Sequence, residues 1–208
     1  MKTLFALLSI GLLTLTADVT TDGLAIGDKA PMTDVPMMDV SGEKMTLQQM
    51  AGENGLAVIF SCNTCPFVIG NAEKSEGWEG RYNDYVMAGQ KTGINMVLVN
   101  SNEAKRGQGD SFDDMVAHAK TQGYKSKYVL DENHVLADAF GAKTTPHVYL
   151  FNKEMELVYQ GAIDDNVNKA EDVKEYYLMD AMKATMDGQE VKVKETKAIG
   201  CSIKRVKK

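Results

Sequence analysis

The sequence predicts an α/β sandwich, and three observations carry that prediction. Two apolar runs without polar alternation, at 56–60 and 94–99, are typical of central strands covered on both faces. Segments with apolar residues at helical spacing follow these runs and separate them from further short strands. The chain has 208 residues, of which 44% are hydrophobic, enough for one well-buried core. The resulting order of strands and helices describes a sheet with helices packed on it.

The elements before the first central strand are expected to be short. Residues 20–30 are polar and predict an extended lead-in. After them, two short strands are expected around the turn Ser41-Gly42, followed by a brief helix at 47–50. This part of the chain therefore predicts an N-terminal hairpin that extends the sandwich.

A longer helix is expected between the two central strands. Apolar residues recur at helical spacing from 66 to about 88, but Gly70, Gly77 and Gly80 interrupt the pattern and predict a kink or a break. The second half of the chain is expected to contain, in order, a helix opened by Ser111 and Asp114 and running through Ala119, a strand at 128–130, a helix at 135–140, a hairpin of 147–151 and 156–159, and a helix at 170–186.

The first residues have the order of a secretory signal peptide. Lys2 precedes an apolar run from Leu4 to Leu15, and the small residue Ala17 follows. The run is shorter than the ~20 residues that a membrane-spanning helix needs. We therefore expect a signal peptide at 1–17, a periplasmic or secreted protein, and no stable membrane insertion after cleavage.

Charge is unevenly placed along the chain. The formal net charge is −6, which argues against a nucleic-acid partner, yet the tail at 191–208 is basic. A solvated tail and an electrostatic docking surface are both compatible with this composition.

Cys62 and Cys65 form a C-x-x-C pair directly after the first central strand. At the junction of a strand and a helix, unsatisfied backbone N–H groups stabilise a thiolate at the first cysteine. Cys62 is then expected to attack a disulfide, and Cys65 to resolve the mixed disulfide. Pro66 is tolerated in the first turn of the helix. A structural zinc site would need further Cys or His ligands at the usual spacing, which are absent, and an inert disulfide closing so short a loop would add little stability.

A second feature supports redox chemistry. Thr145-Pro146 stands directly before the predicted strand at 147–151, a place where a cis peptide bond is often used. With the strand 56–60, the C-x-x-C pair and the stretch 131–165, this feature resembles the thioredoxin superfamily, in its TlpA-like and peroxiredoxin-like (AhpC/TSA) branches. The resemblance implies a thioredoxin-like three-layer sandwich at 18–190 followed by a C-terminal tail, and a protein that needs no cofactor.

The resemblance also implies roles for individual residues. Cys62 would be the nucleophile, Cys65 the resolving thiol, Pro146 the cis-proline, and Thr145 a contact for the substrate backbone. The protein would then be an exported thiol–disulfide oxidoreductase that acts on protein thiols and disulfides and is recharged by a redox partner. Thioredoxins carry Trp where this chain has Ser61 and keep a buried acid in the preceding strand. Here that strand is wholly apolar, so it offers no general base to deprotonate Cys65. Glu73 and a water are the two candidates for that role.

Two other functions compete with this interpretation. Thiol peroxidases of this superfamily place Thr or Ser three residues before the reactive cysteine, and before Cys62 that position holds Ile59. Copper handling is the main alternative, with Cys62, Cys65 and His147 as a Cys₂His ligand set suited to soft metals. His118 and His134, on predicted helices, are not expected to be ligands.

The remaining cysteine, Cys201, lies in the tail. A spare buried cysteine is one interpretation, because free Cys packs as a small hydrophobe. The other is that the tail folds back and Cys201 acts as a third redox thiol by exchanging with Cys62.

Overall fold

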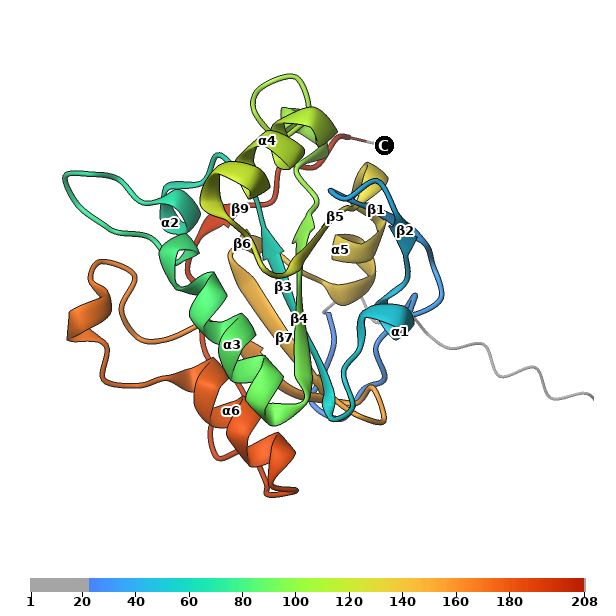
Figure 1. Ribbon diagram of the computed structural model, residues 1–208, viewed down its shortest axis with the longest axis vertical. Coiled ribbons are helices and arrows are strands. Elements are labelled where there is room, and N and C mark those ends of the chain that lie inside the picture. The colour runs from blue at the N-terminus through green and yellow to red at the C-terminus, as the bar shows by residue number, and fades with distance from the viewer. Residues whose placement is uncertain (1–22, 208) are drawn as a thin grey trace, which may run out of the picture.

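A seven-stranded sheet runs through the centre of the computed structural model, which describes residues 23–207 (Figure 1). The expected signal peptide at 1–17 lies outside these residues. The strand order is β2-β1-β5-β4-β3-β7-β8, and a second sheet pairs β6 with β9. The strands are β1 (Met37–Asp39), β2 (Lys44–Met45), β3 (Gly55–Ser61), β4 (Ile94–Asn100), β5 (Lys127–Leu130), β6 (Thr144–Thr145), β7 (His147–Asn152), β8 (Leu157–Gly161) and β9 (Cys201–Ser202).

The apolar run in β3 is explained by burial on both of its faces. Ala57 and Ile59 point into one core, whereas Leu56, Val58 and Phe60 point into the other, and all five side chains are fully buried. Because side chains alternate along a strand, a strand between two helical layers has no solvent face and needs no polar residue. The predicted three-layer sandwich is confirmed.

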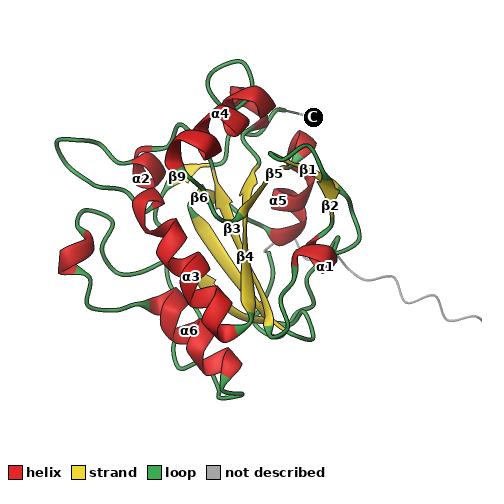
Figure 2. Cartoon of the chain, viewed as in Figure 1, coloured by secondary structure: helices red, strands yellow, loops and turns green. Residues whose placement is uncertain are grey.

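Helices cover the two faces of the sheet (Figure 2). Residues of α3, α4 and α6 enter the first core, and residues of α1 and α5 enter the second. The helices are α1 (Leu47–Met50), α2 (Pro66–Ile69), α3 (Tyr82–Thr92), α4 (Phe112–Gln122), α5 (Val135–Phe140) and α6 (Tyr177–Met186). Within residues 23–207, no helix has the length and apolar character that crossing a bilayer requires.

The predicted N-terminal hairpin is present and is continuous with the main sheet. Met37 in β1 lies opposite Met45 in β2, and the other edge of β1 pairs with β5 in antiparallel register. Asp39 fixes this edge, because its buried carboxylate accepts the Tyr128 backbone N–H at 2.9 Å. The hairpin therefore enlarges the central sheet.

The helix predicted at 66–88 is broken into two. It stops at Ile69 and resumes at Tyr82, after a loop and one 3-10 turn at Glu79–Arg81. Gly70 and Gly77 both have positive φ, of 83° and 71°, and their backbones meet across the neck of the loop. The glycines thus mark a real break, as the interrupted pattern suggested.

Gly77→Ala is expected to lower the free energy of unfolding by about 1–3 kcal/mol, because the methyl group overpacks the neck of the loop. A Cβ at Gly77 would lie 2.4 Å from the backbone nitrogen of Gly70 and 2.4 Å from the carbonyl oxygen of Val68. Gly80→Ala is the matched control, since a Cβ there meets nothing within 4 Å. Urea unfolding of both variants measures the difference; equal midpoints would contradict this account.

The helix predicted at 170–186 and the hairpin beside it also differ in detail. Residues 170–172 form a separate 3-10 turn, and α6 begins only at Tyr177. The residues between are exposed or half-buried, so a longer helix would bury no apolar face there. The hairpin connection is shifted by one residue from the prediction, because β7 ends at Asn152 and β8 begins at Leu157.

The tail at 191–208 runs back over the molecule as an extended chain. The Gln160 N–H donates to the Lys194 carbonyl at 2.9 Å, and the Thr196 N–H donates to the Gln160 carbonyl at 3.0 Å. Further on, β9 pairs with β6 in antiparallel register. The tail therefore ends beside the segment that precedes Pro146.

Candidate redox site

The two cysteines of the C-x-x-C pair lie side by side under Thr145. Cys62 follows β3 directly, and its Sγ lies 3.3 Å from the Thr145 hydroxyl. The Cys65 Sγ lies 3.1 Å from the Thr145 carbonyl oxygen, to which the thiol form donates. The Thr145-Pro146 peptide bond is cis. Both cysteines are almost fully buried, with 1% and 2% of their surface exposed.

The start of α2 differs from the sequence-based expectation. Cys65 occupies the N-cap position and Pro66 the first turn, so Cys62 stands outside the helix. The helix is also a single turn of four residues. Because the Pro66 ring favours the first helical position, the helix begins one residue after the second cysteine. The sequence predicted that the start of the helix would stabilise a Cys62 thiolate. This prediction is wrong, because Cys62 lies outside the helix.

The third cysteine joins the pair. Cys201 lies opposite Thr145 in the β6–β9 pairing. Its backbone N–H and its thiol both hydrogen-bond to the sulfur of Cys65, and the Phe67 N–H donates to the sulfur of Cys201. The tail folds back, as one sequence-based hypothesis required, but the sulfur that Cys201 contacts is that of Cys65.

These contacts separate the pKa values of the three thiols. The hydrogen bond from the Cys62 thiol lowers the pKa of Cys65 to about 5, and the thiol and N–H of Cys201 act in the same direction against the effect of burial. The same contact with Cys65, together with burial and the charge of Asp110, raises the pKa of Cys62. Burial and the neighbouring Cys65 raise the pKa of Cys201 to about 11. Cys65 is therefore the thiol that ionises first.

The stability of the reduced protein is expected to depend on pH accordingly. The pKa of Cys65 falls from 9.0 to about 5 on folding, so its contribution is complete above pH 9 and is lost as the pH falls through 5. The raised pKa of Cys201 acts oppositely, and its contribution is lost between pH 9 and 11. Urea unfolding under reductant should show stability rising from pH 5 to 9. A Cys65→Ser variant should lack most of that rise; an identical rise in both proteins would refute the assignment.

Asp110 organises the C-x-x-C loop, and the sequence analysis did not identify it. Its fully buried carboxylate accepts hydrogen bonds from the Asn63 N–H at 2.8 Å and the Thr64 hydroxyl at 2.8 Å. The side-chain amides of Asn100 and Asn102 donate to the same carboxylate at 2.9 Å and 3.0 Å. A signal was present: the polar run at 100–102 follows a buried strand parallel to β3, and parallel strands end at the same edge.

Two buried tyrosines complete the surroundings of the loop. The Tyr128 hydroxyl donates to the Asn63 side chain at 2.8 Å and accepts from Asn100 at 2.9 Å. The Tyr82 hydroxyl lies 3.0 Å from the Ser61 hydroxyl. Burial raises the pKa of both tyrosines, so they remain neutral hydrogen-bonding groups beside the thiols.

Glu73, one sequence-based candidate for a base, lies in an exposed turn, where its backbone N–H bonds to Asn71. The buried carboxylate that hydrogen-bonds to the C-x-x-C loop is that of Asp110, which is held by four donors. Glu73 is therefore not positioned by the hydrogen bonds that organise the dithiol.

The alternative metal ligands are not brought together. The His147 ring packs against Tyr149, with its Nδ1 3.4 Å from the tyrosine hydroxyl, and burial lowers the pKa of His147 to about 4. In the part of the chain that the structure describes, no group of three or more Cys, His, Asp and Glu side chains is arranged to hold a metal ion. The described residues therefore do not bring Cys62, Cys65 and His147 together as a ligand set, and copper binding there stays a sequence-based hypothesis. The other two histidines contact carboxylates instead, His118 that of Glu79 and His134 that of Asp138.

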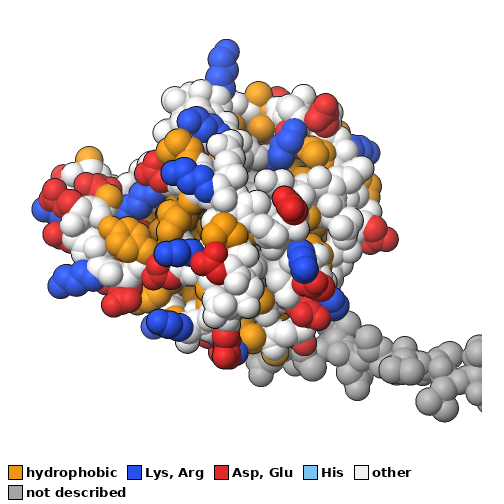
Figure 3. All heavy atoms as spheres, turned by 60° about the horizontal axis from the view of Figure 1, so that its bottom comes forward, with side chains coloured by type: hydrophobic (Ala, Val, Ile, Leu, Met, Phe, Trp, Pro, Cys, Tyr) orange, Lys and Arg blue, Asp and Glu red, His pale blue; other side chains and the backbone are white. Residues whose placement is uncertain are grey.

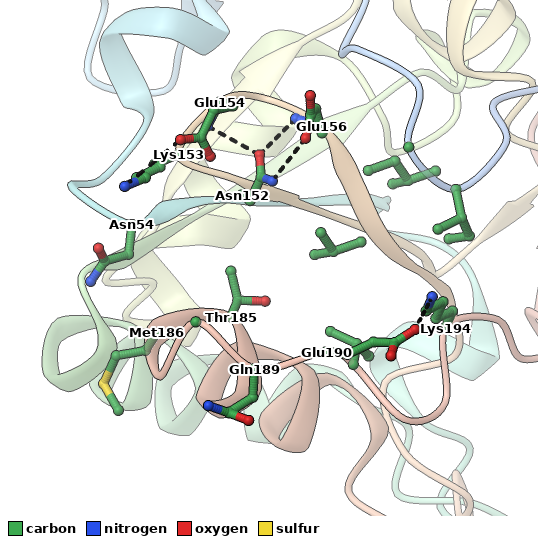
Figure 4. Close-up of a pocket in the computed structure, with 16 residues that line it drawn as sticks. Asn54, Asn152, Lys153, Glu154, Glu156, Thr185, Met186, Gln189, Glu190 and Lys194 are labelled. Atoms are coloured by element: carbon green, nitrogen blue, oxygen red, sulfur yellow. Dashed lines mark hydrogen bonds and ion pairs between the residues drawn. The ribbon is translucent and has the colours of Figure 1, made fainter.

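A groove of about 430 Å³ lies at the opposite end of the sheet (Figure 4). Asn152 is one of the residues that line it, and it pairs with Gly55 at the start of β3. Cys62 follows the opposite end of that strand. Its charges are largely paired, as in the Lys194–Glu190 contact at 2.6 Å. Acidic, basic and hydrophobic side chains mingle over this end of the molecule (Figure 3). The groove is separated from the thiols by the length of β3.

Comparisons with known proteins agree with this architecture. Residues 26–160 match the AhpC/TSA family. An uncharacterized conserved protein from Geobacillus kaustophilus is 27% identical, with 88% of this chain and 94% of that chain covered and a TM-score of 0.78. A hypothetical protein from Sinorhizobium meliloti is 28% identical, with coverages of 89% and 97% and a TM-score of 0.78. No curated protein matches the chain.

More distant structures share the fold alone. Peroxiredoxin Q from Xanthomonas campestris is 19% identical, with 81% of this chain and 98% of that chain covered and a TM-score of 0.52. The family match spans both the strand that leads to Cys62 and the strand that follows Pro146. The protein has a thioredoxin-type fold, and the chain belongs to the AhpC/TSA family.

Proposed function

We propose that this protein is a thiol–disulfide oxidoreductase that exchanges electrons with the thiols and disulfides of other proteins through Cys62 and Cys65. The observation that carries the proposal is the arrangement of the two sulfurs. They are hydrogen-bonded to each other, both contact Thr145, and one has a strongly lowered pKa. Thiolate is the form that attacks a disulfide. A pair of thiols in contact, one of them a thiolate at neutral pH, has the properties that exchange requires.

We assign the attack to Cys65 because its pKa is lowered while that of Cys62 is raised, and this reverses the roles expected from the sequence. The Cys65 thiolate attacks one sulfur of a substrate disulfide, forming a mixed disulfide and releasing the other sulfur as a thiolate. Cys62 then attacks the Cys65 sulfur, and its proton passes to the second substrate sulfur as that group leaves. The products are the Cys62–Cys65 disulfide, one substrate thiol and one substrate thiolate, which takes up a proton from water. The reverse sequence oxidises a substrate dithiol.

The surroundings of Thr145 suit this chemistry. Its hydroxyl lies beside Cys62 and its carbonyl beside Cys65, so one residue positions both sulfurs. The hydrogen bonds that Asp110 accepts from Asn63 and Thr64 fix the two residues between the cysteines. A rigid loop keeps the sulfurs within reach of each other through both steps.

Peroxidase chemistry is not part of the proposal. Ile59, three residues before Cys62, is fully buried and apolar, so that position offers no hydroxyl to a peroxide. For Cys65 the corresponding residue is Cys62 itself.

Turnover with a protein disulfide tests the function. The reduced protein is expected to reduce insulin disulfides, or to exchange with another model protein disulfide, while Cys65→Ser does not react and the double variant C62S/C201S stops at the mixed disulfide. Gly80→Ala is a matched control at an exposed site. A reduced wild-type protein that reacts with neither substrate would refute the proposed function.

We also propose that the protein works in the periplasm or outside the cell, on the basis of the signal-like order of residues 1–17. Mass spectrometry of the protein isolated from its host is expected to give a mature chain that begins at Asp18. A chain that retains residues 1–17 and stays in the cytoplasm would contradict this.

A further inference from the structure

The tail strand β9 lies along the segment that leads to the cis-proline. Thr145 pairs with Cys201 and Thr144 with Ser202, in antiparallel register (Figure 1). Cys201 lies 55 residues after Pro146 in the sequence. The pairing nevertheless brings it into contact with the Cys65 sulfur. The tail therefore forms one wall of the redox site.

The close approach of the tail depends on Gly200. A Cβ at this position would lie 2.2 Å from the Thr145 carbonyl oxygen and 3.1 Å from the Pro146 nitrogen. Only glycine fits without moving the backbone. The residue before Cys201 thus lets the two strands meet closely enough for Cys201 to reach Cys65.

The tail is also held on the other side of Cys201. The Ile203 N–H donates to the Lys143 carbonyl at 3.0 Å, and the Lys204 N–H donates to the Asn102 side chain at 2.9 Å. The Ile203 side chain is buried in the second core. Cys201 is therefore fixed from both directions, unlike a cysteine on a loose terminus.

Cys65 is the thiol that contacts both of the others. Its sulfur hydrogen-bonds to the Cys62 thiol on one side and to the Cys201 thiol on the other. Burial follows the same order: Cys62 and Cys65 are buried, and Cys201 is partly exposed. A substrate arriving from solvent meets Cys201 before it meets the other two sulfurs.

We propose that Cys201 is a third redox thiol, and that a disulfide passes between the buried Cys62–Cys65 pair and Cys201 by exchange at the Cys65 sulfur. This inference rests on the proposed function of the pair. It makes Cys201 the outward end of a relay within one chain, and it gives β9 a chemical role in addition to its packing.

The exchange balances without any further oxidant or reductant. The Cys201 thiolate attacks the Cys65 sulfur of the Cys62–Cys65 disulfide, the Cys65–Cys201 bond forms, and Cys62 leaves with the proton that Cys201 gave up. A low-molecular-weight disulfide reacts first at Cys201, the partly exposed thiol. Oxidised glutathione forms a mixed disulfide with Cys201 and releases one glutathione thiol. Cys65 then attacks Cys201 and releases the second.

Disulfide mapping after oxidation tests the relay. The reduced full-length protein is mixed with oxidised glutathione, quenched with an alkylating agent at a series of times, and mapped by mass spectrometry. We expect both Cys62–Cys65 and Cys65–Cys201 disulfides in the wild type, and Cys65–Cys201 alone in Cys62→Ser. If Cys62→Ser never forms Cys65–Cys201 while Cys201→Ser still forms Cys62–Cys65, the relay is wrong and the proposed function stands. If neither the wild type nor Cys201→Ser forms a Cys62–Cys65 disulfide, the proposed function itself fails.

Gly200→Ala tests whether the strand pairing matters without altering any sulfur. The added methyl group should push β9 away from Thr145 and slow formation of Cys65–Cys201 at least ~10-fold, because exchange needs aligned sulfurs. Formation of Cys62–Cys65 should persist, which also shows that the variant is folded. Ser202→Ala is the matched control, since the Ser202 side chain is exposed and its backbone pairing is retained. Cys65–Cys201 formation at the wild-type rate in Gly200→Ala would overturn the role of the pairing.

Discussion

Replacing Cys65 with serine is expected to remove the thiolate that is present at neutral pH and to lower turnover with a protein disulfide at least ~1,000-fold. The reason is that Cys65 alone of the three cysteines has a lowered pKa, of about 5, while the pKa values of Cys62 and Cys201 are raised. The ultraviolet absorbance of the thiolate, followed from pH 4 to pH 9, measures the titration directly and does not depend on access to the buried sulfur.

The matched variant is Cys62→Ser, in which a serine hydroxyl can still donate to the Cys65 sulfur. It should keep a titration below pH 7, shifted upward, and should be defective in resolving the mixed disulfide. The double variant C62S/C201S lacks both neighbouring thiols and is expected to accumulate the mixed disulfide with its substrate. If Cys62→Ser abolishes the low titration and Cys65→Ser keeps it, Cys62 is the attacking thiol and the assignment from the contacts is wrong.

Asp110→Asn is expected to have the largest effect outside the cysteines. The buried carboxylate accepts four hydrogen bonds, and an amide in its place turns an NH₂ group toward some of those donors. We expect the free energy of unfolding to fall by about 2 kcal/mol, which is typical of losing hydrogen bonds to a buried charged group. The pKa of Cys62 should fall as well, because the charge of Asp110 raises it.

Asp113→Asn is the control for this variant. Asp113 lies in the first turn of α4 and is exposed, so its loss should cost less than about 1 kcal/mol. Urea unfolding measures stability, and the alkylation rate of Cys62 in a Cys65→Ser background, followed against pH, measures its pKa. A Cys62 pKa that is unchanged in Asp110→Asn would show that the carboxylate acts on the loop through hydrogen bonds alone.

Much of the fold could be predicted from local signals. The apolar run in β3 indicates a strand with two covered faces, and Ser111 with Asp114 forms the predicted capping box at the start of α4. The helix extends three residues beyond the predicted end at Ala119, because Gly123 is the residue that adopts a left-handed conformation and ends it. Such signals act within a few residues, which is why they can be interpreted without the tertiary structure.

The site could be located from the sequence but not understood from it. The spacing of Cys62 and Cys65 and the position of Pro146 indicated where the chemistry would be, and the three lie together. Which thiol ionises depends on where α2 begins and on a tail strand from far along the chain, and neither is encoded in the spacing. The role of Asp110 depends on the tertiary structure in the same way, because two of its four donors come from the C-x-x-C loop, far from it in the sequence.

The central claim, that Cys62 and Cys65 form a reversible dithiol, is tested most directly by a redox titration of the reduced protein in glutathione buffers, with the thiols counted and the disulfides mapped at each point. We predict a two-electron couple between about −270 and about −120 mV, the range of thiol–disulfide oxidoreductases, in which the Cys62–Cys65 disulfide reopens fully on reduction. A protein in which these two cysteines never form a disulfide at any ratio, or form one that does not reopen in this range, would contradict the account.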